Sequence, residues 1–166
     1  MPKTTNISFS FKEFGNKDEL SYGDRELINI AIETANNAYA PYSGFRVGAA
    51  IRLKSGMIVK GANVENAAFP SGICAERNAL SNSVSNHPDD HPVAIAIAAL
   101  SGDEQTELPV TPCGNCRQVL AEEESRHGNE IKVILSGKAK TYIINSIGEL
   151  LPLQFNNENL KTILPL

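Results

Sequence analysis

The chain has 166 residues, of which 42% are hydrophobic and 20% are charged, which is ordinary usage for one globular domain. Its 15 Lys and Arg against 19 Asp and Glu give a net charge of −4 without any basic run, so a polynucleotide substrate or partner is disfavoured. No apolar run reaches the roughly 18 residues that span a bilayer, and the N-terminus lacks the apolar stretch of a secretory signal. We therefore expect a soluble cytoplasmic protein, without a membrane partner, that acts on a neutral small molecule.

The first twenty residues differ in pattern from the rest of the chain. Ile7, Phe9 and Phe11 alternate with polar residues at the period of a strand, and a glycine with polar neighbours then ends the pattern. Both an edge strand and an arm fit this segment. We expect residues 1–20 to form an N-terminal extension and residues 21–166 to form a single domain.

A first amphipathic helix is predicted from Asp24, which is a plausible N-cap, to a point near Pro41. Two β-rich runs come next, at residues 45–53 and 57–63. Three residues that include a glycine separate these runs, so an antiparallel hairpin is the economical connection.

Helical and strand patterns alternate through the rest of the chain. Strands are predicted at residues 93–100, 131–135 and 142–144, and helices at residues 74–80, 113–125, 147–151 and 158–163. Such alternation implies a sheet with helices on both faces. The predicted fold class is therefore α/β, in three α/β/α layers around a central mixed sheet of about five strands.

Three cysteines carry the strongest chemical signal in the chain. Cys113 and Cys116 form a Cys-x-x-Cys pair, Cys74 stands alone, and all three lie at the start of predicted helices. Three buried core cysteines would be the plain alternative. The spacing favours a zinc site in a reducing compartment, because helix N-termini stabilise thiolates and the close pair can point at one ion.

The predicted zinc site has an open fourth position. A structural site would need a fourth ligand, but none of the three histidines, His87, His91 and His127, has ligand spacing to the cysteines, and we expect all three at the surface. A ligand set of three thiolates leaves room for water at the metal. Glu76, two residues after Cys74, could manage protons at that open position.

Three thiolates on Zn²⁺ leave a net charge of −1, which weakens the acidification of water at the metal. Arg77 could offset this charge by donating hydrogen bonds to the sulfurs. The alternative for Arg77 is an ordinary arginine on a helix surface.

The residues quoted so far belong to longer blocks that resemble one known family. The chain is similar to cytidine deaminases of the small, zinc-dependent, homotetrameric type, within the cytidine and deoxycytidylate deaminase superfamily. The matching blocks are Pro41-Tyr42-Ser43-Gly44-Phe45-Arg46-Val47-Gly48-Ala49-Ala50, Asn63-Val64-Glu65-Asn66-Ala67, Gly72-Ile73-Cys74-Ala75-Glu76-Arg77, Pro112-Cys113-Gly114-Asn115-Cys116-Arg117-Gln118-Val119-Leu120 and Glu149-Leu150-Leu151-Pro152. They stand in the family's order from about residue 20 to residue 155.

This resemblance implies hydrolytic deamination of cytidine and 2′-deoxycytidine to uridine and 2′-deoxyuridine, with release of ammonia, in pyrimidine salvage. It implies one zinc per chain and a homotetramer with active sites near subunit interfaces. Glu76 would take a proton from zinc-bound water and deliver it to N3 of the ring, while the oxygen attacks C4.

The resemblance also implies substrate contacts. Asn63 and Glu65 would bind the ribose hydroxyl groups, and the backbone N–H of Ala75 would bind the base carbonyl. Phe45 would pack beside the pyrimidine, with a role in the core as its alternative. Phe155 would reach the site of a neighbouring subunit, with simple packing of the C-terminus as its alternative.

Two departures from the family pattern stand out. Phe69 replaces a tyrosine that is frequent in the family. The chain also has an N-terminal extension, residues 1–20, that goes beyond the compact family core. A blasticidin-type deaminase shares the cysteine and glutamate elements and is one rival interpretation, although the block from Asn63 to Asn66 favours a ribonucleoside pocket. A non-catalytic scaffold stabilised by zinc is the rival from a different class.

Overall fold

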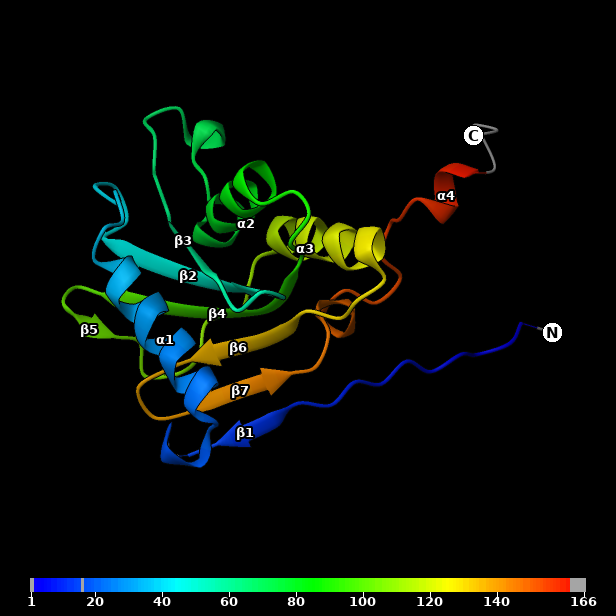
Figure 1. The fold of residues 1–166 in the computed structure, drawn as a ribbon, viewed down its shortest axis with the longest axis horizontal. Coiled ribbons are helices and arrows are strands. Elements are labelled where there is room, and N and C mark those ends of the chain that lie inside the picture. The colour runs from blue at the N-terminus through cyan, green and yellow to red at the C-terminus, as the bar shows by residue number, and fades with distance from the viewer. Residues whose placement is uncertain (1, 16, 162–166) are drawn as a thin grey trace.

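The computed structural model describes residues 2–15 and 17–161 (Figure 1). Its strands are β1 (Lys12–Phe14), β2 (Phe45–Leu53), β3 (Ile58–Ala62), β4 (Pro92–Ser101), β5 (Glu104–Gln105), β6 (Lys132–Ser136) and β7 (Thr141–Ile144). Its α-helices are α1 (Tyr22–Ala35), α2 (Ala75–Asn86), α3 (Gly114–His127) and α4 (Glu158–Lys161), and its 3-10 helices are η1 (Lys17–Glu19), η2 (Phe69–Ser71) and η3 (Ile147–Leu150). None of the helices within these described ranges is long and apolar enough to cross a membrane.

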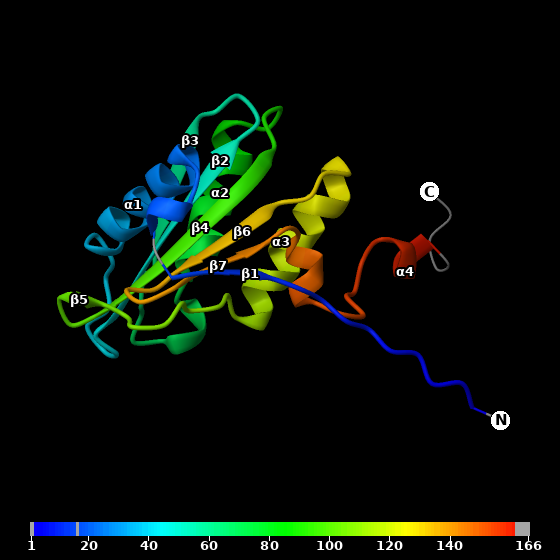
Figure 2. The same cartoon turned by 90° about the horizontal axis from the view of Figure 1, so that it is seen from below.

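The strands form one mixed sheet in the order β1-β7-β6-β4-β2-β3, with β5 paired to β4. The β4–β6 pair is parallel and the other pairs are antiparallel. Figure 2 shows α1 on one face of this sheet and α2 and α3 on the other. The α/β class and the three layers predicted from the sequence are therefore confirmed.

The sheet has seven strands, whereas the sequence predicted about five. The hairpin of β2 and β3 and the strands β4, β6 and β7 lie where the sequence placed them. The two additional strands, β1 and β5, are only three and two residues long. Strands this short carry little hydrophobic periodicity and form because an edge of the sheet offers them backbone partners.

The N-cap of α1 is Ser21, not Asp24 as the sequence suggested. The Ser21 hydroxyl accepts a hydrogen bond from the backbone N–H of Asp24 at 3.1 Å. The Asp24 carboxylate is nearly buried and instead lies 2.5 Å from the Lys132 ammonium on β6. A contact between residues so far apart in the chain cannot be read from local spacing, and it ties α1 to the sheet.

The central strands send alternate side chains into two cores. In β4, Ile95 and Ile97 face α2 and α3, whereas the side chains that face α1 are alanines. Small side chains on this second face allow α1 to lie close to the strands, and Gly48 is the extreme case because an added Cβ would lie 2.0 Å from the Ala31 carbonyl oxygen. The larger side chains of β4 therefore lie under the two helices that begin beside the cysteines.

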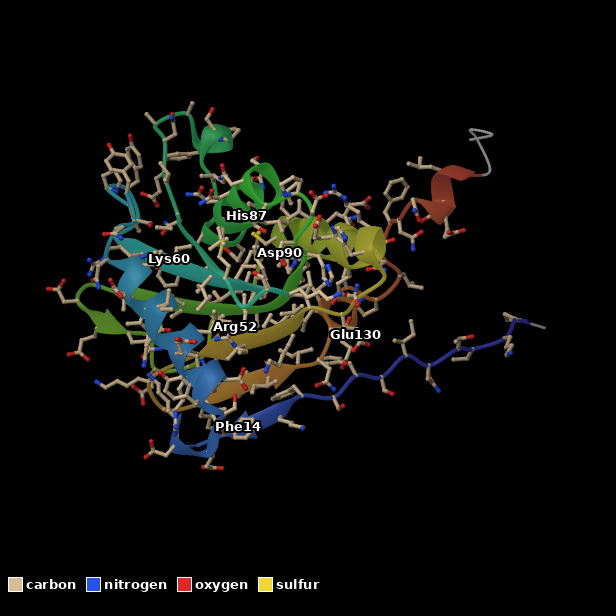
Figure 3. All side chains as sticks on the ribbon, in the orientation of Figure 1. Phe14, Arg52, Lys60, His87, Asp90 and Glu130 are labelled. Atoms are coloured by element: carbon tan, nitrogen blue, oxygen red, sulfur yellow. The ribbon has the colours of Figure 1, made fainter. Side chains whose placement is uncertain are left out.

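Residues 2–9 extend away from the body of the molecule (Figure 1), whereas the Ser10 N–H lies 3.4 Å from a Glu149 carboxylate oxygen and the Phe11 ring packs against Tyr142 at 4.9 Å. The side chains of Ile7, Phe9 and Phe11 are 48–59% exposed. Closer to the domain, β1 pairs with β7, and Phe14 (labelled in Figure 3) and the buried Leu20 pack on the core beneath α1. The strand pattern seen in the sequence thus continues as an exposed arm and becomes a paired edge strand only at residue 12.

We expect Gly61→Ala to destabilise the fold because α2 crosses β3 directly over Gly61. A Cβ at this position would lie 2.3 Å from the Ala79 nitrogen and 2.6 Å from the Ala75 carbonyl oxygen, so the helix would have to shift. Overpacking of this kind costs about 1–3 kcal/mol in the free energy of unfolding, measurable by urea denaturation. The matched control is Gly15→Ala, where an added Cβ meets no atom within 4 Å. Equal unfolding free energies for the two variants would show that α2 does not depend on this approach.

Candidate active site

The three cysteines meet where α2 and α3 begin. Cys74 directly precedes α2, Cys113 directly precedes α3, and Cys116 is buried in the first turn of α3. The sulfur of Cys113 lies 4.0 Å from that of Cys74 and 3.5 Å from that of Cys116, and all three sulfurs lie within 4.8 Å of one another. Zn–S bonds of about 2.3 Å in a tetrahedron place sulfurs about 3.8 Å apart, so the donor set fits zinc.

The helix starts supply positive potential to this cluster. Neither Cys74 nor Cys113 caps its helix through a side-chain hydrogen bond, and the first-turn N–H groups of both helices have no partner within the helix. Burial raises the pKa of the Cys74 and Cys116 thiols. Burial also acts on Cys113, but hydrogen bonds from Cys116 and from the Asn115 backbone outweigh it and lower the pKa of the Cys113 thiol.

The histidines lie away from the cysteine cluster. His87 (labelled in Figure 3) is the C-cap of α2, at the end of the helix opposite Cys74. His91 and His127 stack with their ring centroids 5.2 Å apart, and Nε2 of His127 lies 2.9 Å from a Glu123 carboxylate oxygen. No second group of three or more Cys, His, Asp or Glu side chains converges in this way within residues 2–15 and 17–160.

Glu76 is buried beside the cysteines, with only 5% of its surface exposed. Burial raises the pKa of its carboxyl group, while hydrogen bonds from its own backbone N–H and from Cys116 act in the opposite direction. A carboxyl group with a raised pKa accepts and releases a proton closer to neutral pH. Glu76 is therefore a buried carboxyl group with a raised pKa, directly beside the three cysteines.

A cavity of about 330 Å³ opens over Glu76. It is lined by Ser43, Phe45, Val47, Asn63, Glu65, Cys74, Glu76, Ile97, Val110, Thr111 and Cys113. A second, more open cavity of about 520 Å³ shares four of these residues and continues toward Phe69 and Gly72. The fold thus brings Phe45, Asn63 and Glu65 to one hollow with Glu76 and two cysteines, from four separate segments of the chain.

Asn63 is held rigidly at the end of β3. Its Oδ1 accepts a hydrogen bond from the Val47 N–H at 2.7 Å, and its Nδ2 donates to the Phe45 carbonyl at 3.0 Å. An amide NH₂ has two hydrogens, so one donor remains for a ligand in the cavity.

Glu65 organises the turn before β2. Its carboxylate accepts hydrogen bonds from the Ser43 hydroxyl at 2.5 Å and from the Tyr42 N–H at 2.9 Å. The Ser43 hydroxyl, followed by the Tyr42 N–H, lowers the pKa of Glu65, which therefore stays ionised at neutral pH. The sequence analysis assigned no role to Ser43, although a serine before a glycine is typical of such a turn.

Four of the expected site residues lie outside the cavity lining, namely the buried Cys116 and the residues Ala75, Arg77 and Phe155. Ala75 is the first residue of α2 and its side chain is fully buried, so only its backbone can face a ligand. Arg77 is half-buried, and its guanidinium makes no hydrogen bond or ion pair with the residues that the structure describes. Phe155 is 60% exposed, and its carbonyl accepts a hydrogen bond from Nε2 of Gln118 at 2.8 Å.

The sequence analysis also gave no role to Thr111 or Arg117. Thr111 lines the cavity, and the Arg117 guanidinium donates through Nε to the Pro112 carbonyl at 2.8 Å. Arg117 follows Cys116 directly and stands in the family block that begins at Pro112, whereas the only sequence signal for Thr111 was its position two residues before Cys113.

Comparisons with known proteins agree with this geometry. Residues 21–127 match the family described as "Cytidine and deoxycytidylate deaminase zinc-binding region". A cytidine deaminase of Halalkalibacterium halodurans is 40% identical over 146 residues, which cover 82% of this chain and 98% of that protein. A blasticidin-S deaminase of Bacillus cereus is 30% identical over 138 residues, which cover 82% of this chain and 94% of that protein.

A crystal structure of cytidine deaminase from Burkholderia pseudomallei has the same fold. It superimposes with a TM-score of 0.69 at 34% identity and covers 82% of this chain and 100% of that one. The matched family region contains all three cysteines and Glu76, the residues that converge at the starts of α2 and α3. The chain belongs to the cytidine and deoxycytidylate deaminase family and carries its zinc-binding region.

Proposed function

We propose that the chain catalyses the zinc-dependent hydrolytic deamination of cytidine and 2′-deoxycytidine to uridine and 2′-deoxyuridine, with release of ammonia. The observation that carries this proposal is the buried Glu76 beside three convergent cysteines, at the base of a cavity that Phe45 and Asn63 also line. Relatives named cytidine deaminase that align over most of the chain support it.

Cys74, Cys113 and Cys116 would hold one zinc ion per chain. When bound, zinc supplies Lewis-acid activation of water at neutral pH. Arg77, next to Glu76 and without another partner among the described residues, would offset the charge of the thiolates.

Glu76 would carry the protons of the reaction. It takes a proton from the attacking water and passes it to ring N3, while the water oxygen forms a bond to C4. The second proton of that oxygen then moves through Glu76 to the amino group, and the C4–N bond breaks. Ammonia leaves, the product keeps the N3 proton and a C4 carbonyl, and Glu76 is ionised again.

The cavity wall would orient the nucleoside. The remaining Nδ2 hydrogen of Asn63 and the carboxylate of Glu65 suit ribose hydroxyl groups, which both donate and accept hydrogen bonds. Phe45 would pack beside the pyrimidine, and the Ala75 N–H at the start of α2 would bind the base carbonyl.

We further propose a homotetramer with active sites near subunit interfaces. Exposed aromatic side chains support this arrangement, because Tyr42 and Phe69 flank the open cavity in edge-to-face contact at 5.8 Å and both are more than half exposed. The exposed Phe155 would enter the site of a neighbouring subunit. Residues 21–166 would be the catalytic domain and residues 1–20 an extension, in a cytoplasmic enzyme of pyrimidine salvage that binds neither nucleic acid nor membrane.

Purified protein should contain about one zinc per chain and convert cytidine to uridine, with loss of absorbance in the cytosine band. The assay compares cytidine, 2′-deoxycytidine, cytosine, deoxycytidine monophosphate and blasticidin S. Turnover of blasticidin S alone would favour the activity named for the Bacillus cereus relative. Zinc content without turnover of any of the five compounds would favour a non-catalytic zinc scaffold.

Glu76→Gln should retain zinc and lose about three or more orders of magnitude in kcat/KM for cytidine, because the amide cannot take up and release protons. Atomic absorption measures whether the variant retains zinc, and the absorbance assay measures its turnover of cytidine. Glu122→Gln, on the polar side of α3, is the control and should leave both quantities unchanged. A Glu76→Gln enzyme with near-normal turnover would remove Glu76 from the proton-transfer role.

Glu65→Gln should raise KM for cytidine about tenfold or more and leave kcat less affected, because a charged hydrogen bond to a ribose hydroxyl is lost. This change also weakens the turn at Ser43, so Ser43→Ala is the matched variant that perturbs the turn and keeps the carboxylate. A direct ribose contact predicts a much larger rise in KM for Glu65→Gln than for Ser43→Ala. Equal effects would mean that Glu65 acts only by holding the turn.

A further inference from the structure

We propose that Arg117 is a positioning residue that fastens the loop carrying Cys113 to the 3-10 helix η3 and so sets the geometry of the zinc centre. This inference rests on the proposed function for the presence of zinc. The Arg117 side chain does not line the cavity. It holds the segment that contributes Thr111 to the cavity wall and leads into Cys113.

Three hydrogen bonds of Arg117 define the role. Its Nε donates to the Pro112 carbonyl at 2.8 Å, and one terminal nitrogen donates to the Leu150 carbonyl at 2.9 Å. The other terminal nitrogen lies 3.5 Å from the Thr111 hydroxyl oxygen, within reach of a weak hydrogen bond. The rigid fork of a guanidinium can hold such divergent acceptors at once, whereas an ammonium cannot match the geometry.

The loop that Arg117 holds leads directly into a metal ligand. Among the described residues, residues 109–112 have no hydrogen-bond partner other than Arg117. Pro112 has no N–H to donate, and its carbonyl is the last acceptor before Cys113. Arg117 therefore restrains both Thr111 in the cavity wall and the entry of the chain into α3.

The helix η3, whose Leu150 carbonyl accepts a hydrogen bond from Arg117, is itself held in place by α3. Glu124 accepts hydrogen bonds from the Ile147 N–H and from the Ser146 hydroxyl, both at 2.9 Å, at the start of η3. Arg117 and Glu124 lie about two turns apart on α3 and so share one face of the helix. α3 thereby makes hydrogen bonds to both ends of η3. The Leu150 carbonyl has a fixed position as a result, and the guanidinium can hold the loop relative to it.

The two arginines that follow cysteine-bearing helix starts, Arg77 and Arg117, differ in their contacts. Arg77 follows Glu76 directly but has no hydrogen-bond partner among the described residues, whereas Arg117 uses all three guanidinium nitrogens on backbone and hydroxyl acceptors. A side chain with these contacts fixes where Cys113 lies before any metal binds. Groups that orient metal ligands in this way change metal affinity about 10–100-fold when removed.

The test compares Arg117→Gln and Arg117→Lys with Arg126→Gln in the full chain. Arg126 is the matched control because it lies at the other end of α3, and its half-exposed guanidinium makes only an ion pair of 3.6 Å, with the buried Glu123, which also lies 2.9 Å from His127. Three quantities are measured: the zinc dissociation constant by chelator competition, the absorption of the Co²⁺-substituted protein, and the rise in Tm on adding zinc.

We expect Arg117→Gln to weaken zinc binding about 10–100-fold, to shift the Co²⁺ thiolate bands and to reduce the rise in Tm. Arg117→Lys should give an intermediate loss because one ammonium cannot serve all three acceptors, and Arg126→Gln should stay within about twofold of the wild type. If Arg117→Gln does not fold, the lysine variant decides the question by the same measurements.

An Arg117 variant with lower Tm in both the zinc-free and the zinc-loaded protein, but with unchanged zinc affinity and Co²⁺ spectrum, would overturn the inference. Arg117 would then stabilise the fold without positioning the ligand. This outcome is distinct from a failure of the proposed function, which would appear in the wild type as absence of zinc or of nucleoside turnover.

Discussion

The approach of two helix starts on one face of the sheet is the constraint on which the rest of the structure depends. α2 and α3 begin within a few ångströms of each other, and this alone brings Cys74 to the Cys113–Cys116 pair although the two segments are far apart in the chain. The approach requires α2 to lie directly on β3, which the absence of a side chain at Gly61 permits. Unpaired N–H groups at both helix starts then stabilise the negative charge that the cysteines carry when they bind metal.

The same packing explains the state of Glu76. As the second residue of α2 it turns inward beside the sulfurs, and burial raises the pKa of its carboxyl group. The carboxylate of Glu65, in the same cavity, belongs to a half-buried residue and accepts hydrogen bonds from the Ser43 hydroxyl and the Tyr42 N–H, which lower its pKa. The surroundings of the two carboxyl groups in this one hollow thus shift their pKa values in opposite directions, which suits the different roles proposed for them.

Sequence patterns predicted the elements whose structure depends on residues close together in the chain. The β2–β3 hairpin, the strands β4, β6 and β7, and the helices that begin at the cysteines were all predicted, because hydrophobic periodicity and turn residues are properties of short segments. The predicted N-cap at Asp24 was wrong, since its carboxylate is taken by Lys132, more than a hundred residues away. The helix predicted over residues 158–163 is seen at Glu158–Lys161, and the end of that prediction lies outside the described residues.

The amino-acid sequence by itself predicted a zinc site from the spacing of three cysteines and a glutamate, and it indicated the family through the resemblance of several longer blocks. Only the tertiary structure decided which other side chains share the cavity and which hydrogen bonds hold the loop before Cys113. Ser43 reaches Glu65, and Arg117 reaches Leu150 by hydrogen bonds across separate segments. Such contacts depend on how helices and strands pack in three dimensions, and the identity of neighbours in sequence carries no record of them.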